Sequence, residues 1–164
     1  GSKSGADECG IIVAGVICKG PPQEWKAVVL EDASVQGASP NAWAQAASDA
    51  MQRWEAERLV VEVNQGGDMV SSVIRQVDPI MPITAVHASK GKVARAEPVA
   101  ALYEQGRVTH MRGLGALEDQ MCLMTAQGYD GKGSPDRVDA LVWALFELMI
   151  KPTQTWRRPQ IRSL

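Results

Sequence analysis

Hydrophobic and polar residues follow one another along the chain in patterns that predict strands and helices in turn. Apolar runs at residues 9–18 and 28–30 have strand character, and the Gly20-Pro21-Pro22 turn between them predicts an antiparallel hairpin. In the rest of the chain, some segments have apolar residues at helical spacing and others are short apolar runs. They predict helices over residues 39–54, 68–77, 90–105 and 114–124, and strands over residues 58–64, 82–87 and 106–110. Strand–helix alternation after an opening hairpin predicts an α/β fold with a mixed central β-sheet flanked by helices.

The stretch from Ser134 to Phe146 predicts the start of a last helix and then its buried part. Ser134 is expected to be the N-cap, and Pro135 suits the first helical position, where an N–H is not needed. Asp136 and Asp139 lie three residues apart and therefore share one face of the helix. Such carboxylates either complement the helix dipole or bind a cation, and acidic first turns are common enough that the pair alone favours the dipole.

Glu62 carries more information, because it lies within an apolar strand. Alternation places Val60, Glu62 and Asn64 on one face of that strand. A charge there is costly unless it is solvated at a sheet edge, paired with an arginine such as Arg58, or bound to a metal ion. An acidic strand residue combined with acidic residues on a late helix is the arrangement that ribonuclease H-like nucleases use to hold two divalent ions. Mg²⁺ and Mn²⁺ prefer such oxygen ligands, and two ions activate water against a phosphodiester.

Composition narrows the class of protein without deciding its function. The 164 residues are 45% hydrophobic with a net charge of −2, which is typical of one globular domain. Overall basicity is absent, so nucleic-acid binding would need a local patch, and no apolar run is long enough to cross a membrane. The three cysteines, Cys9, Cys18 and Cys122, lack zinc-ligand spacing and are expected to be buried thiols in a reducing cytoplasm.

With these residues assembled, the chain resembles the C-terminal nuclease domain of the large subunit of tailed-phage terminases. The matching motifs, in chain order, are Asp7-Glu8-Cys9-Gly10-Ile11, Glu62-Val-Asn-Gln-Gly-Gly67, His87-Ala-Ser-Lys-Gly-Lys-Val-Ala-Arg-Ala-Glu-Pro98, Ala101-Leu-Tyr-Glu-Gln-Gly-Arg-Val108 and Ser134-Pro-Asp-Arg-Val-Asp-Ala-Leu-Val-Trp143. The resemblance implies a ribonuclease H-like domain over residues 1–150. Residues 151–164 are expected to form an irregular tail because they are rich in proline and arginine. It also implies metal-dependent cutting of concatemeric viral DNA in the host cell cytoplasm.

The resemblance further implies roles for the acidic residues. Glu62 resembles the family's second catalytic acid and Asp136 the third, with Asp139 as a neighbouring ligand or helper, and together they would hold two Mg²⁺ or Mn²⁺ ions. The family's first catalytic aspartate ends a strand upstream of the hairpin, and this sequence has no such strand. The chain is therefore expected to be truncated, and weak or inactive alone. Asp7 lies near that point, but it is not assigned the role.

The partners implied by the resemblance are double-stranded DNA, the portal protein and the small terminase subunit, with no membrane. Lys90, Lys92 and Arg95 gather at the start of a predicted helix, where they form either a solvated face or a patch that binds DNA phosphates. His87 and His110 are expected to be structural. No Gly-x-x-x-x-Gly-Lys-Ser/Thr loop occurs, so ATP hydrolysis is not expected.

Two other functions fit the same residues. A Holliday-junction resolvase of the same fold also ends in an Asp-x-x-Asp-Ala helix, and a preference for branched DNA would distinguish it. A non-catalytic module that grips DNA or docks on the portal would bind duplex DNA without taking up metal.

Overall fold

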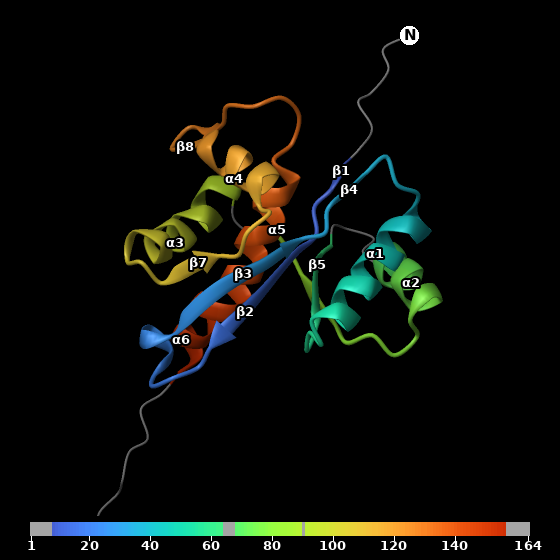
Figure 1. Cartoon of the computed structure of the whole chain (residues 1–164), viewed down its shortest axis with the longest axis horizontal. Coiled ribbons are helices and arrows are strands. Elements are labelled where there is room, and N and C mark those ends of the chain that lie inside the picture. The colour runs from blue at the N-terminus through green and yellow to red at the C-terminus, as the bar shows by residue number, and fades with distance from the viewer. Residues whose placement is uncertain (1–7, 64–67, 90, 157–164) are drawn as a thin grey trace, which may run out of the picture.

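The computed structural model describes residues 8–63, 68–89 and 91–156. The predictions that concern Asp7, Asn64, Lys90 and the end of the tail lie outside these ranges. Strands and helices alternate as expected, and the elements divide between two sides of a long hairpin (Figure 1).

The hairpin forms the middle of the molecule. β2 (Ile12–Ile17) pairs with β3 (Lys26–Asp32) in antiparallel fashion, and β7 (Val108–His110) adds to β3 in parallel. A short 3₁₀ turn, Pro22–Glu24, lies between the two long strands. The antiparallel pairing and the mixed strand directions are therefore confirmed.

The first predicted strand, residues 9–18, is divided in the structure. Its first residue belongs to a separate short strand, and β2 begins only at Ile12. β1 (Glu8–Cys9) pairs instead with β4 (Val35–Gln36). Between β1 and β2, the N–H of Ile11 donates to the hydroxyl of Ser34 at 3.0 Å. Gly10 packs directly against the backbone at the start of the last long helix, where a Cβ atom would collide with Asp136. The chain therefore bends at residues 10–11 and does not run straight from residue 9 to residue 18.

On one side of the hairpin lies a unit of two helices and two strands. It consists of α1 (Pro40–Arg53), β5 (Leu59–Glu62), α2 (Asp68–Val77) and β6 (Ile83–Val86), with β5 and β6 parallel. Ser39 begins α1 as predicted, because its hydroxyl accepts the N–H of Ala42 at 3.3 Å. Within the described residues β5 has no hydrogen-bonded strand neighbour except β6, so the strands fall into separate ladders and not one continuous sheet.

On the other side lie the helices that follow β6. They are α3 (Lys92–Glu104), α4 (Gly115–Cys122), α5 (Asp136–Leu145), a π-helical turn (Phe146–Ile150) and α6 (Lys151–Thr155). Between α4 and α5, β8 (Met124–Thr125) pairs with β9 (Gly128–Tyr129), so part of the predicted loop is a small hairpin. The expectation of an irregular tail was wrong for residues 151–155. The helix continues there, with Lys151 pairing with Glu147 one turn earlier at 3.4 Å.

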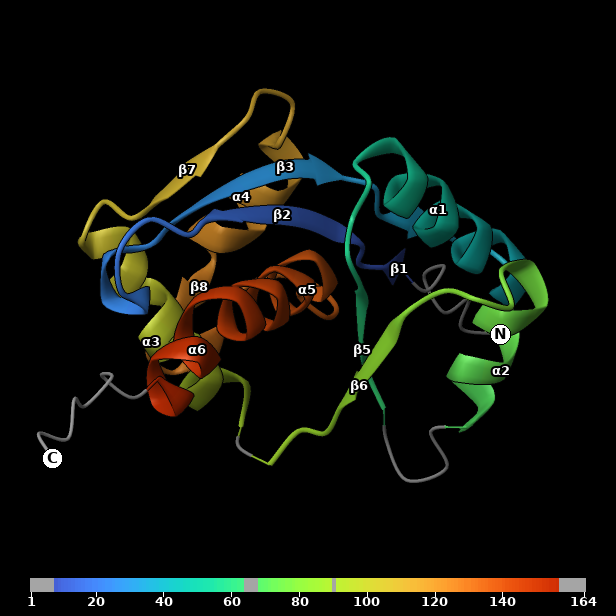
Figure 2. The same ribbon diagram turned by 90° about the horizontal axis from the view of Figure 1, so that it is seen from below.

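The apolar core consists of two clusters. The larger joins the hairpin and β7 to α3, α4, α5 and the π-helical turn, with Val29, Leu117, Leu145 and Met149 fully buried. The smaller is centred on Ala44, Ile74 and Met81 between α1, α2, β5 and β6. Figure 2 shows β5 passing close to one end of the hairpin, with α1 and α2 on one side of β5 and α5 on the other.

Burial corrects the expectation about the cysteines. Cys18 and Cys122 are exposed, not buried, because Cys18 follows the end of β2 and Cys122 ends α4; Cys9 is half-buried. In the described ranges, no helix has the length and apolar character needed to cross a membrane.

Candidate functional site

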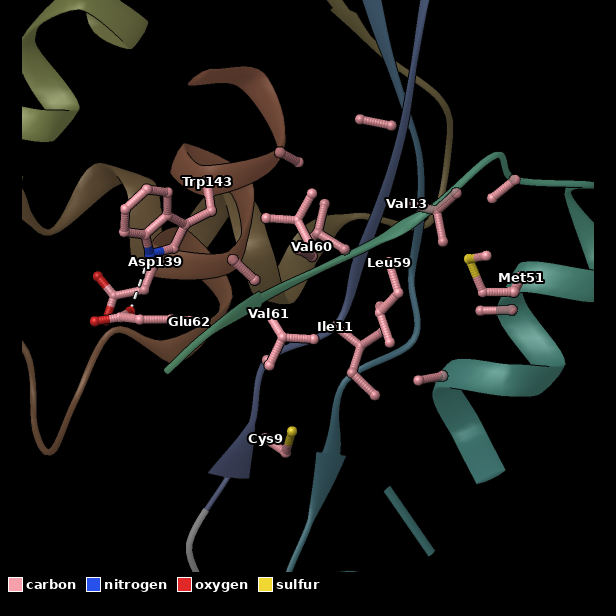
Figure 3. Close-up of a pocket in the computed structure, with 18 of the residues that line it drawn as sticks. Cys9, Ile11, Val13, Met51, Leu59, Val60, Val61, Glu62, Asp139 and Trp143 are labelled. Carbon is pink, nitrogen blue, oxygen red and sulfur yellow. Dashed lines mark hydrogen bonds between the residues drawn. The ribbon is translucent and has the colours of Figure 1, made fainter. Parts of the chain in front are cut away.

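Glu62 ends β5 and points toward α5. Alternation along the strand sends Leu59 and Val61 into the smaller core cluster and leaves Glu62 on the opposite face, as predicted. Its Oε2 accepts a hydrogen bond of 2.9 Å from the indole Nε1 of Trp143 (Figure 3). Glu62 is thus neither paired with Arg58 nor simply solvated. Arg58 pairs instead with the buried carboxylate of Glu147 at 3.5 Å.

Asp139 lies in the first turn of α5, next to Glu62 (Figure 3). The ammonium of Lys92, at the start of α3, donates to Asp139 Oδ2 at 2.6 Å, and it also reaches the hydroxyl of Ser134 at 3.3 Å. The side chain of Asp139 is only 17% exposed, whereas that of Lys92 is 49% exposed. Lys92 therefore joins α3 to α5 at the rim of the site.

The predicted N-cap at Ser134 was wrong. The helix begins at Asp136 after Pro135, and no side chain at the cap position accepts a hydrogen bond from it. The amide oxygen of Gln120, on α4, instead accepts the N–H groups of Arg137 and Val138 at 3.2 and 3.3 Å. Free N–H groups of the first helical turn are thus satisfied from another helix. Asp136 and Asp139 are both in the first turn, as predicted.

The three predicted acidic residues influence one another electrostatically. Burial raises the pKa of Asp139, the hydrogen bond and charge of Lys92 oppose that rise, and the charges of Asp136 and Glu62 add to it. Burial, followed by the charge of Asp136, also raises the pKa of Cys9. A cavity of about 440 Å³ has Glu62, Asp136 and Asp139 on its wall and extends between β2 and β5 toward α1. The structure therefore brings all three carboxylates to one cavity.

The donor set suits a hard divalent cation, since carboxylate oxygens are its preferred ligands. Mutual repulsion among the three carboxylates is the kind of cost that a bound cation removes. Among the described residues, however, no three His, Cys, Asp or Glu side chains are placed to hold one ion together. Hydrogen bonds to other side chains partly explain why the carboxylates do not converge: Lys92 donates to Asp139, and Trp143 donates to Glu62. Glu62 and Asp139 are the pair best placed to contribute ligands, with Asp136 on the same wall.

Comparison with known proteins agrees with this fold. The family described as "Terminase RNaseH-like domain" matches residues 1–148. The chain belongs to this family. No curated protein matches the sequence. Among solved structures, the large terminase nuclease from thermophilic phage G20c, crystallised with bound cobalt, matches with a TM-score of 0.56 and 17% identity. The match covers 84% of this chain and 80% of that one. At this identity the match establishes the fold alone. The family description gives the fold as ribonuclease H-like, as predicted.

Trp143 of this terminase domain lies differently from the expectation. It falls in the stretch predicted as the buried part of the last helix, yet it is only half-buried and its indole N–H donates to Glu62. Asp139 and Trp143 are four residues apart in α5 and therefore share a helix face. That spacing was the available signal, since a helix that presents a carboxylate to a site presents the residue one turn later as well.

Arg95, predicted to contact DNA, also lies differently from the expectation. Its side chain is buried in α3, 8% exposed, and its guanidinium lies over the Trp143 ring at 4.8 Å from the centroid. The role in binding phosphates stays a prediction for Lys92, which is exposed, and for Lys90, which lies outside the described residues. Burial favours an internal role for Arg95, beside the aromatic ring.

Proposed function

We propose that this chain is the metal-dependent endonuclease domain of a phage terminase large subunit, which cuts concatemeric viral DNA during genome packaging. One observation carries the proposal. Glu62 from a strand and Asp139 from the start of a late helix lie next to each other, with Asp136 on the wall of the same cavity. Family membership over residues 1–148 supports the nuclease class, and the cobalt in the structural neighbour supports a divalent metal.

The proposed metal is Mg²⁺ or Mn²⁺, bound as two ions by Glu62, Asp136 and Asp139. Bound there, such ions would activate the attacking water and stabilise the leaving oxygen of a phosphodiester. The chain's own residues prepare the ligands. Trp143 fixes one oxygen of Glu62, and Lys92 keeps Asp139 in place and partly offsets the effect of burial on it. Glu62 is exposed, so its end of the cavity is open to a DNA strand.

DNA would approach along the side where Lys92 is exposed. Lys90 and Lys92 supply positive charge next to the carboxylates, and binding through so few phosphate contacts should be independent of sequence and sensitive to salt. The portal protein and the small terminase subunit are the partners proposed from family membership.

The test is nicking of supercoiled plasmid in Mn²⁺. Glu62→Ala and Asp136→Ala should each reduce nicking below detection, because each removes a proposed ligand. Asp49→Ala is the matched control, since Asp49 is an exposed carboxylate on α1 that accepts a hydrogen bond from Gln45.

Unchanged cutting by both site variants would remove the nuclease assignment from these residues. The second candidate function is a non-catalytic DNA-gripping or portal-docking module, and the ammonium of Lys92 on Asp139 favours it, because a lysine there already neutralises one proposed ligand. Duplex binding without metal uptake by the wild-type protein would decide for this second function.

A further inference from the structure

The face of α5 that carries Asp139 also carries Trp143. Because the two residues are one turn apart, both point toward the end of β5, where Glu62 lies (Figure 3). Asp139 would bind a cation directly, whereas the indole N–H of Trp143 donates to Glu62 Oε2 at 2.9 Å. One helix face thus supplies one proposed ligand and the hydrogen bond that holds another.

The chemistry of the indole distinguishes it from the other donor in the site. An indole is a neutral donor with no acceptor atom, so it can orient a carboxylate without neutralising its charge. The ammonium of Lys92, by contrast, brings a full positive charge to Asp139. The hydrogen bond from Trp143 goes to Oε2 of Glu62 and leaves the negative charge of that carboxylate available to a cation.

The position of the indole is itself fixed by two neighbours. Arg95 lies over the ring face, 4.8 Å from its centroid, and is buried. The ring of Phe146 meets the Trp143 ring edge-on, with centroids 6.4 Å apart and planes at 77°. A cation over an aromatic face and an edge-on aromatic contact both favour one ring orientation. Arg95 and Lys92 lie three residues apart at the start of α3, so one turn of that helix reaches both carboxylates, one directly and one through Trp143.

We propose that Trp143 is a positioning residue for Glu62, and that Arg95 acts on Glu62 through Trp143 by fixing the indole ring. This inference rests on the proposed function, because it concerns the affinity of the same site for a divalent ion. Hydrogen-bonding partners of metal ligands orient them, and losing such a partner lowers metal affinity about 10–100-fold.

The experiment measures Mn²⁺ affinity by calorimetric titration of the whole chain, together with the melting temperature of the metal-free protein. Trp143→Phe keeps an aromatic ring and removes the N–H, and it should weaken Mn²⁺ binding by about 10-fold or more. Trp54→Phe is the matched control. It also removes an indole N–H from a carboxylate, Glu31 at 3.4 Å, but away from the site. That variant should bind Mn²⁺ as the wild type does.

A second route uses Arg95→Met, which leaves the indole in place without the guanidinium over it. This variant should bind Mn²⁺ more weakly than the wild type, and adding it to Trp143→Phe should lower the affinity no further, because both changes act on one hydrogen bond. Independent, additive losses would overturn the role assigned to Arg95. The second route also tests the proposal if Trp143→Phe fails to fold.

The outcomes distinguish a failure of the positioning role of Trp143 from a failure of the proposed metal-dependent function. If the wild type binds Mn²⁺ and Trp143→Phe binds it equally well, the positioning role is wrong and the proposed function stands. If the wild type takes up no Mn²⁺, the metal-dependent function and the positioning role both fail. Equal losses of affinity in Trp143→Phe and Trp54→Phe would show a general effect of losing an indole, and would also overturn the proposal.

Discussion

At the scale of single residues, His110 shows how burial couples a side chain to pH. It ends β7, and its Nε2 lies 2.6 Å from the hydroxyl of Tyr103 on α3, with the two rings edge-on. Burial lowers the pKa of His110, while the charge of Glu118 opposes that effect. Burial also raises the pKa of the Tyr103 hydroxyl. Burial therefore favours the neutral form of both groups.

The pH dependence of stability follows from this shift. Because the folded-state pKa of His110 is lowered, the unfolded chain takes up a proton first as the pH falls below about 6.5, the ordinary value for histidine. The contribution of His110 to stability is thus present above that pH and is lost as the pH falls through the folded-state pKa. His110→Gln should flatten the fall in free energy of unfolding between pH 7.5 and 5, measured by urea denaturation. His87→Gln, at the other and exposed histidine, should leave the wild-type slope; an equal flattening there would contradict the assignment.

At the scale of elements, the placement of Asp136 depends on what surrounds the start of α5. Arg137 pairs with Glu8 of β1 and with Asp32 of β3, the latter at 2.8 Å, so it anchors the helix to two strands. Gln120 of α4 accepts the first free N–H groups of the helix. Gly10 allows the bend between β1 and β2 to lie directly on the helix backbone.

Gly10→Ala should therefore move the start of α5. A Cβ there would lie 2.5 Å from the carbonyl carbon of Asp136 and closer still to its oxygen, so either the bend or the helix must shift. We expect the free energy of unfolding to fall by roughly 1–3 kcal/mol, as in overpacked cores, and Mn²⁺ affinity to fall with it. Gly15→Ala is the matched control, because its Cβ would meet only Leu30 Cδ1, at 3.6 Å. Thermal unfolding of both variants checks this, and equal stability of the two would be inconsistent with the close contact.

The elements also show where sequence reasoning succeeds and where it stops. Periodicity predicted the bounds of α2, the strand that carries Glu62 and the face on which Glu62 lies, because these depend on local pattern. The cap of α5 was missed because Gln120 comes from another helix, and the continuation through α6 was missed because proline in a tail favoured an irregular ending. Arg95 was predicted to be an exposed cation. Its contact with Trp143, 48 positions later in the chain, could not be predicted, because helical spacing relates only residues within one helix.

At the scale of the whole molecule, the proposed ligands come from two separately packed parts. Glu62 belongs to the part formed by α1, α2, β5 and β6, whereas Asp136 and Asp139 belong to the part built on the hairpin. Among the described residues, the polar contacts that join these parts include Trp143 with Glu62, Arg58 with the buried Glu147, and Arg53 with Glu31. Residues of both parts line the cavity, among them Val13 of β2 and Val60 of β5. A cation bound by Glu62 and Asp139 together would add a further connection between them.

Metal binding should therefore stabilise the smaller part more than the larger. A ligand stabilises the conformation that binds it, and the part with fewer connections gains most when the ligand bridges it to its neighbour. We expect saturating Mn²⁺ to slow amide hydrogen exchange in β5 and β6 more than in β3 and β7, measured by mass spectrometry. In Glu62→Ala this difference should disappear, because the smaller part no longer supplies a ligand, while in Asp49→Ala it should persist. Slowing confined to α5, with β5 unchanged while Mn²⁺ is bound, would mean that the ion does not bridge the two parts and that Glu62 is not among its ligands.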